Sequence, residues 1–174
     1  VLNGTEWSAL NEATFITDEP ASSANLVISE IHYHPSDTQN GDAEFIELMN
    51  ISDTRISLSG VSFIEGISFK FAAQDTLGAR QRIVLALDPL AFAGTYGAGI
   101  PVAGTYVSRL ANDGERITLV AADGSIIQSL RYNDKEPWPA IADGTGYSLV
   151  LVTPTARPNH DLPQNWRSSR SPGG

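Results

Sequence analysis

The chain contains the stretch Leu26-Val27-Ile28-Ser29-Glu30-Ile31-His32-Tyr33, and after a polar loop it continues with Glu44-Phe45-Ile46-Glu47-Leu48-Met49-Asn50-Ile51. Both stretches are short and rich in β-branched or aromatic residues, and turn-forming residues lie on either side of them, which is typical of β-strands. The two stretches therefore predict a pair of strands that are neighbours in one sheet. The rest of the chain can be compared with this pair.

Further runs of the same kind extend the pattern along the chain. They cover residues 61–64, 67–71, 82–87, 116–121, 125–132 and 147–152. The pairs Asn40-Gly41, Asp113-Gly114, Asp123-Gly124 and Asp143-Gly144 favour positive φ in tight turns. These lengths and spacings predict an all-β fold, an antiparallel sandwich or barrel, and not a series of βαβ units.

Three local features add detail to this fold. Residues 116–121 and 125–132 read as a hairpin around Gly124. One short crossover helix is expected after Asp88, which can accept hydrogen bonds from the first turn, with Pro89 at its first position and Gly97 at its end. Asn50 ends a strand, and its side chain is expected to cap the turn that follows.

The domain organisation is read from the ends of the chain, because 174 residues suit one domain with appendages. Residues 1–17 are too apolar for a free tail, and we interpret them as the last strand of a preceding domain or as an N-terminal extension. Residues 18–24 have the composition of a linker, residues 25–166 form the sandwich, and residues 167–174 read as an exit linker. The start of the chain has no signal-peptide pattern, so the sequence reads as a piece of a longer protein.

Composition excludes several classes of function. The net charge is −9, with 11 basic and 20 acidic residues, which disfavours nucleic acid and anionic membrane surfaces as partners. There is no cysteine, so disulfides, thiolate metal sites and cysteine nucleophiles are absent. No apolar run is long enough to predict a membrane span.

A series of short motifs follows the first two stretches along the chain. It consists of Leu58-Ser59-Gly60-Val61, Arg82-Ile83-Val84-Leu85-Ala86, Leu110-Ala111-Asn112-Asp113-Gly114-Glu115, Asp134 with Pro137-Trp138-Pro139, Gly144-Thr145-Gly146-Tyr147-Ser148-Leu149, Asn165-Trp166 and Ser171-Pro172-Gly173-Gly174. In order and spacing the set resembles the bacterial lamin tail domain family over residues 25–174. Residues 1–16, which contain Trp7-Ser8-Ala9-Leu10 and Glu12-Ala13-Thr14-Phe15, resemble the closing strand of a chitobiase-type C-terminal domain.

The resemblance implies an immunoglobulin-like sandwich that is exported, at the cell surface or secreted, as part of a multidomain protein. The family has no catalytic residues that could be assigned to positions of this chain. Other domains of the same polypeptide are the first partners it implies.

Two groups of polar side chains could carry chemistry. His32 and His34 lie two positions apart in a strand, so they share a face and could bind zinc, with Glu30, Asp37 or Asp42 as a third ligand. The alternative is a pair of exposed imidazoles at a strand end. Glu30, Glu44 and Glu47 could act as paired carboxylates, as in a glycosidase. We favour a strand-edge charge pattern in which one of them is held by backbone N–H groups or by an arginine.

The polar loop over residues 37–44 offers oxygen ligands for calcium, although it does not match the EF-hand template. A solvated turn is the alternative. Trp138, between two prolines, is expected to cover one end of the core. Trp138, Trp166 and Tyr106 are the aromatic candidates for ligand contact. Packing in the core is the alternative, and we favour it for Trp166 and Tyr106.

The sequence therefore predicts a non-catalytic interaction or spacer module of a larger exported protein. A carbohydrate- or polymer-binding module, with calcium assistance in the 37–44 loop, is the alternative. A metal-dependent hydrolase built on His32 and His34 is the third hypothesis. No resident cofactor is expected, and protein or polysaccharide would be the external partner.

Overall fold

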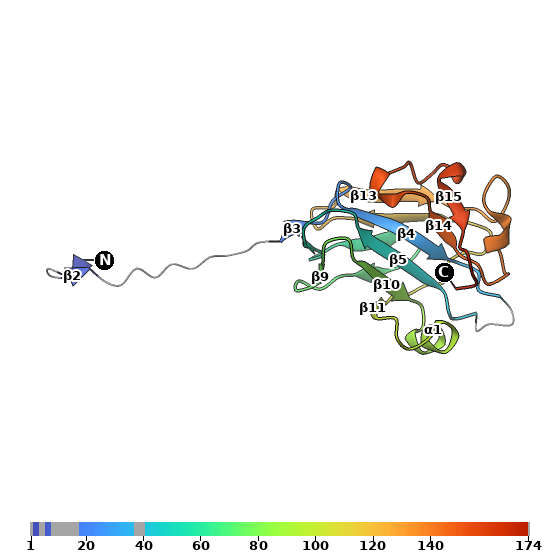
Figure 1. Ribbon diagram of the computed structural model, residues 1–174, viewed down its shortest axis with the longest axis horizontal. Helices are drawn as coiled ribbons and strands as arrows, with labels where there is room; N and C mark the ends of the chain where they lie inside the picture. The colour runs from blue at the N-terminus through green and yellow to red at the C-terminus, as the bar shows by residue number, and fades with distance from the viewer. Residues whose placement is uncertain (1, 4–5, 8–17, 37–40, 174) are drawn as a thin grey trace.

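The computed structural model describes residues 2–3, 6–7, 18–36 and 41–173, and its strands form a β-sandwich (Figure 1). One layer is a six-stranded sheet in the order β11-β10-β5-β4-β14-β15. Its strands in chain order are β4 (Leu26–His32), β5 (Phe45–Asn50), β10 (Arg82–Ala86), β11 (Val102–Thr105), β14 (Leu149–Leu151) and β15 (Trp166–Ser168).

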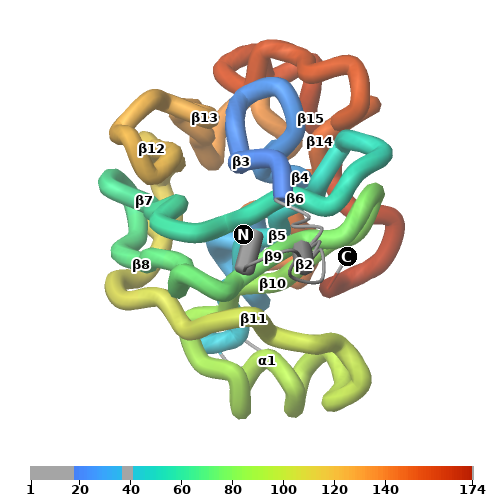
Figure 2. Tube along the Cα trace, turned by 90° about the vertical axis from the view of Figure 1, so that its left-hand side faces the viewer, coloured from blue at the N-terminus to red at the C-terminus, as the bar shows by residue number. Residues whose placement is uncertain are grey.

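The other layer is a four-stranded sheet in the order β13-β12-β7-β8, which lies on the left in Figure 2. Its strands are β7 (Ser62–Glu65), β8 (Phe69–Lys70), β12 (Arg116–Val120) and β13 (Ile126–Arg131). A small sheet at one end joins β3 (Glu19–Pro20), β6 (Ile56–Ser57) and β9 (Thr76–Leu77). Near the start of the chain, β1 (Leu2–Asn3) pairs with β2 (Glu6–Trp7).

The core lies between the two larger sheets. Ile28 pairs with Leu48 across β4 and β5, and both side chains are buried in the same cluster as Leu119 of β12 and Leu130 of β13. Burying one side chain of this size contributes roughly 1.5–3 kcal/mol. Apolar side chains buried between the two sheets therefore hold the layers together, and this arrangement confirms the predicted immunoglobulin-like sandwich.

A bulge in β4 creates a link between the layers. The pairing of β4 with β5 shifts register between Ile28 and Glu30. The N–H of Ile28 donates to Oε1 of Gln128, on β13 of the other sheet, at 2.6 Å. The Gln128 amide nitrogen in turn lies 2.8 Å from Nε2 of His160, whose ring packs edge-on against Trp166. The side chain of Gln128, which is distant from Ile28 in the sequence, thus accepts the hydrogen bond of a backbone N–H group at the bulge.

The expected crossover helix is confirmed as α1 (Pro89–Tyr96), the one α-helix in the described part of the chain. Asp88 accepts hydrogen bonds from the N–H groups of Leu90 and Ala91, and the N–H of Gly97 donates to the carbonyl of Ala93 at the other end. Short 3₁₀ turns occur at η1 (Ala140–Ala142), η2 (Pro154–Ala156) and η3 (Pro163–Asn165). Within the described residues, no helix has the length and apolar character needed to cross a membrane.

Two strand pairs are parallel, so the expectation of a purely antiparallel sandwich needs correction. β11 runs parallel to β10, and β3 runs parallel to β6. Adjacent parallel strands require a crossover connection, and α1 supplies it between β10 and β11. The periodicity of a strand does not show its direction relative to its neighbour, so the sequence could not reveal these pairs.

The turn after β5 depends on Asn50, as predicted. Its buried side-chain amide donates to the carbonyls of Thr54, Leu77 and Gly78 at 2.8–3.0 Å. Its Oδ1 accepts from both the N–H and the hydroxyl of Ser52. One asparagine therefore joins its own turn to the segment after β9.

The strands expected from the sequence are present, and the hairpin of β12 and β13 forms with Gly124 at φ +84°. The structure adds five strands of two to four residues that were not predicted, namely β3, β6, β9, β11 and β15. They are too short for a two-residue alternation to be read in their sequences.

Both expected linkers need correction, because hydrogen bonds attach these two segments to the fold. In residues 18–24, β3 pairs with β6 and Ala21 is buried. In residues 167–174, the chain continues β15, Ser169 donates to the carbonyl of Ser148, and Gly173 donates to that of Gly146. Main-chain pairing needs no apolar side chains, so a segment with linker composition can still be part of a sheet. Of residues 1–17, only the backbones of β1 and β2 are described, so the expected closing strand lies largely outside the described residues.

Candidate functional site

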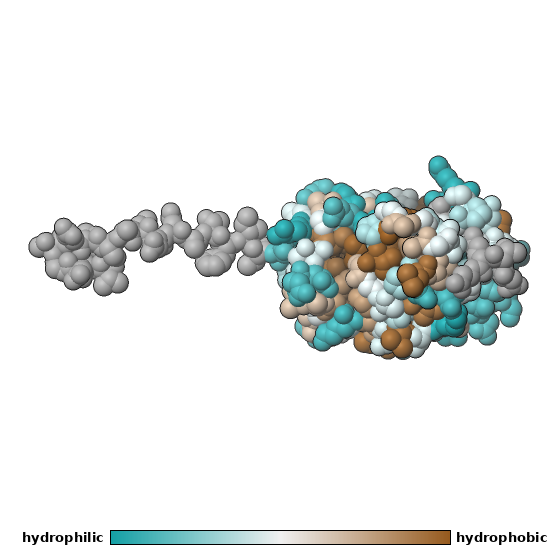
Figure 3. Space-filling model, turned by 90° about the horizontal axis from the view of Figure 1, so that it is seen from below, coloured by the Kyte–Doolittle hydropathy of each residue, from teal (hydrophilic) through white to brown (hydrophobic). Residues whose placement is uncertain are grey.

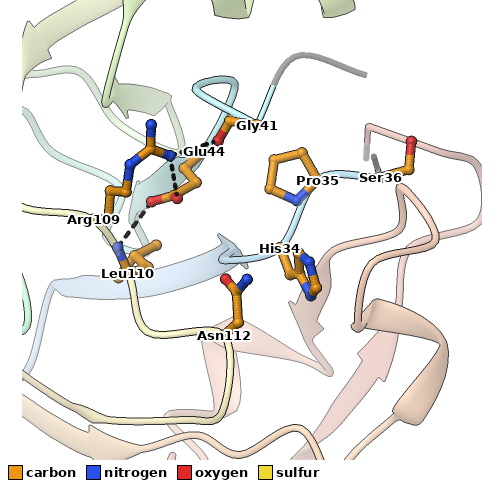
Figure 4. Close-up of a pocket in the computed structure, with 8 residues that line it drawn as sticks. All are labelled: His34, Pro35, Ser36, Gly41, Glu44, Arg109, Leu110 and Asn112. Atoms are coloured by element: carbon orange, nitrogen blue, oxygen red, sulfur yellow. Dashed lines mark hydrogen bonds and ion pairs between the residues drawn. The ribbon is translucent and has the colours of Figure 1, made fainter. Parts of the chain in front are cut away.

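A hollow of about 490 Å³ lies beyond the ends of β4 and β5 (Figure 4). Its described lining residues are His34, Pro35, Ser36, Gly41, Glu44, Arg109, Leu110 and Asn112. The segment after β4, the start of β5 and the chain after β11 bring these residues together. The volume is within the range of small-molecule pockets.

Glu44 is the most enclosed charged group of this hollow, with 3% of its surface exposed. One carboxylate oxygen accepts from the Leu110 N–H at 2.9 Å, and the other lies 3.4 Å from the Arg109 guanidinium. Burial raises the pKa of Glu44 to about 7, although both of these contacts favour the charged form. Of the two alternatives for the glutamates, the structure shows the carboxylate held by a backbone N–H group and an arginine.

Arg109 connects Glu44 to the loop in front of it. Its guanidinium also donates to the carbonyl of Gly41 and forms an ion pair with Asp42. Sequence reasoning missed Arg109, because a single arginine outside any strand pattern carries no signal of its partners 65 positions away. The Asn112 side chain is exposed, and its amide points into the space bounded by Glu44, Leu110 and Pro35 in Figure 4.

The two histidines of the zinc hypothesis make separate contacts. His32 is buried, and its Nδ1 lies 2.9 Å from the Tyr96 hydroxyl on α1. Burial lowers the pKa of His32 to about 4. His34 lies beyond the end of β4, and its Nδ1 is 2.5 Å from a carboxylate oxygen of Asp143.

The described residues contain no group of three histidine or acidic side chains that could hold a metal ion. Asp42 pairs with Arg109, and Asp37 lies outside the described residues, as does the first half of the proposed calcium loop, residues 37–40. The zinc site built on His32, His34 and Asp42 is therefore corrected. Tyr96 of α1 contacts one imidazole, and the other bonds to Asp143.

Glu30 and Glu47 are the carboxylates that the sheet places opposite each other. Glu47 accepts from the hydroxyl of Ser29 at 2.6 Å and pairs with Arg82 at 3.0 Å, whereas Glu30 accepts from the hydroxyl of Ser148. Burial is the main cause that raises the pKa of both groups, that of Glu30 to about 7.

These glutamates line a second hollow, of about 410 Å³, on the outer face of the six-stranded sheet. Arg82 and Arg167 are also part of its lining. Like charges on directly opposite residues of neighbouring strands are destabilising, which the two arginines and two serines offset here. Both carboxylates of this pair therefore already have hydrogen-bond or ion-pair partners among neighbouring side chains.

The aromatic candidates are part of the core. Trp138 is 7% exposed, Trp166 4% and Tyr106 1%. Trp138 and Trp166 lie next to each other, with ring centroids 6.2 Å apart, and the Trp166 indole N–H donates to the carbonyl of His160. All three candidates for ligand contact, Trp138, Trp166 and Tyr106, are therefore buried, so the alternative of packing in the core holds for them, and Trp138 covers the core as expected.

Exposed apolar side chains occur on the side of α1 and β11. Leu90 is 85% exposed at the start of α1, and Ile100 and Val107 lie before and after β11. Figure 3 views the molecule from this side and shows brown patches with white and teal surface between them. Scattered apolar residues of this kind are usual on a protein surface.

Residues 19–134 match the family model described as Lamin Tail Domain. No curated protein matches the chain. The matched range includes β3, which the sequence had assigned to a linker, and ends after β13.

Proposed function

The chain belongs to the lamin tail domain family, whose members are non-enzymatic immunoglobulin-like modules, and from this premise we propose that it is a non-catalytic interaction or spacer module of a larger exported bacterial protein. One observation carries the proposal. The described side chains that could serve in catalysis already have partners within the chain, as Glu44 has in Arg109 and Leu110, His34 in Asp143 and His32 in Tyr96.

A catalytic set needs groups that converge on one point and remain free to exchange protons with a substrate. Here the two imidazoles bond to different partners, Tyr96 and Asp143, and the glutamates are divided between two hollows. The arrangement instead stabilises loops and a sheet face that neighbouring domains or another protein can contact. The purified chain is proposed to need no resident cofactor.

The first experiment measures turnover. The purified chain is incubated with chromogenic ester, phosphodiester and glycoside substrates, with and without zinc or calcium. We expect rates equal to buffer for the chain and for the Glu44→Gln and His34→Ala variants. Turnover that copurifies with the chain and is lost in either variant would refute the proposal.

A second candidate function is binding of a polysaccharide or another polymer. The hollow of about 490 Å³ favours it, because the exposed Asn112 amide and the partly exposed His34 ring can hydrogen-bond to hydroxyl groups. On a glycan array, binding should then weaken in Asn112→Ala and persist in Asn133→Ala, an asparagine outside this hollow. No binding on the array, or equal loss in both variants, would exclude this candidate.

A further inference from the structure

The chain after β15 forms a second ladder with the chain before β14. Ser169 and Ser148 exchange two hydrogen bonds: the Ser169 N–H donates to the Ser148 carbonyl at 3.0 Å, and the Ser148 N–H donates to the Ser169 hydroxyl oxygen at 3.2 Å. The Ser169 hydroxyl donates to the carbonyl of Ser171 at 2.7 Å. The Gly173 N–H then donates to the Gly146 carbonyl at 2.8 Å. Residues 169–173 are thus fastened at both ends.

The far end of this segment meets α1. Gly173 has φ +85°, and a Cβ at this position would fall 2.4 Å from Cδ1 of the Tyr96 ring. Its backbone therefore lies directly against Tyr96, the last residue of α1. A side chain would clash with the ring and would also be strained at this φ.

Tyr96 connects α1 to the six-stranded sheet. Its hydroxyl lies 2.9 Å from Nδ1 of the buried His32 on β4, and its ring packs edge-on against Phe45 on β5 at a centroid distance of 5.4 Å. Phe45, Phe92, Val84 and Ala86 form a cluster under α1, separate from the main core. Anything that moves Tyr96 therefore opens this smaller cluster first.

We infer that residues 169–173 act as a strap that holds α1 on the outer face of the six-stranded sheet, so that release of the strap loosens α1 while the sandwich stays folded. α1 depends on this contact because it is short, and short helices gain most of their stability from packing. The main core, by contrast, lies between the sheets and does not include the strap. The inference concerns local opening and does not depend on the proposed function.

The test is hydrogen exchange of individual amides by NMR on the full chain. The reporters in α1 are the N–H groups of Phe92 and Gly97, and those of β12 report on the sandwich. In Gly173→Ala we expect exchange at the α1 reporters to become about tenfold faster, with β12 unchanged. Gly99→Ala is the matched control, because a Cβ there would meet nothing within 4 Å.

A second variant separates the strap from local packing around Tyr96. Ser169→Ala removes the hydroxyl that accepts from Ser148, at a site that does not contact Tyr96 through any hydrogen bond. Faster α1 exchange in both Ser169→Ala and Gly173→Ala supports the strap. Faster exchange in Gly173→Ala alone overturns it, since the effect then comes from the ring contact. Equal acceleration in α1 and β12 also overturns it, because opening would then be global.

Discussion

At the scale of single residues, Asn50 shows how one polar side chain replaces several backbone contacts. It is fully buried, donates hydrogen bonds to three carbonyls and accepts one from the Ser52 N–H. A buried polar group left without a partner costs roughly 1–3 kcal/mol. Few other side chains could satisfy donors and acceptors on both sides of this turn.

Asn50→Ala should therefore lower the free energy of unfolding by about 3 kcal/mol or more, because several buried groups lose their partner together. Urea unfolding followed by tryptophan fluorescence measures the loss. Asn112→Ala is the control, since this side chain is exposed, and it should change stability by less than about 0.5 kcal/mol. A loss for Asn50→Ala as small as that of the control would show that water replaces the amide.

At the scale of elements, α1 has a capped start, and one residue of its first turn, Leu90, is strongly exposed. Asp88 accepts from the N–H groups of Leu90 at 2.8 Å and Ala91 at 3.2 Å. The side chain of Leu90 itself is 85% exposed. At the start of α1, Asp88 therefore stabilises the helix by capping it, whereas the exposed Leu90 contributes little by burial.

Asp88→Ala should lower the free energy of unfolding by about 1 kcal/mol, the usual effect of losing an N-cap. Leu90→Ala, in the same turn, should change it by no more than about 0.5 kcal/mol, because alanine has a good helix propensity and little apolar burial is lost. Thermal unfolding by circular dichroism compares the two. The cap would be unimportant if Leu90→Ala proved the more damaging change.

At the scale of the whole molecule, burial of carboxyls and imidazoles links stability to pH in opposite directions. The pKa of Glu30 and that of Glu44 are raised to about 7 in the fold. Their stabilising contribution is thus fully present below the unfolded pKa of 4.5 and is lost as pH rises to about 7. His32, with its pKa lowered to about 4, and His160, also lowered, contribute above pH 6.5 and lose this as pH falls.

Removing one of these carboxyls isolates its part of the pH dependence. For Glu30→Gln and Glu44→Gln, stability relative to the unmodified chain should increase between pH 4.5 and pH 7 and level off above that, because the unmodified chain must ionise a buried carboxyl in this range. Chemical unfolding at half-unit pH steps measures it, with Glu136→Gln, an exposed glutamate, as the control. A difference that stays flat with pH, or falls, would contradict the raised pKa values.

The sequence by itself determined the local elements. Strand positions follow from runs that bury alternate residues, as in Ile46 and Leu48. The cap at Asp88, the turn at Gly124 and the role of Asn50 follow from the backbone geometry that each residue type favours. Such features depend on residues only a few positions apart, so they can be read from one sequence.

Only the tertiary structure decided which strands are neighbours and what each polar side chain meets. Glu44 is held by Arg109 and Leu110, Gln128 by Ile28, and Gly173 lies against Tyr96, all across long stretches of chain. The same physics explains why the sequence left both exposure and burial open for Trp166 and Tyr106. An aromatic residue is buried or exposed according to what folds over it, and its own sequence neighbourhood does not contain that information.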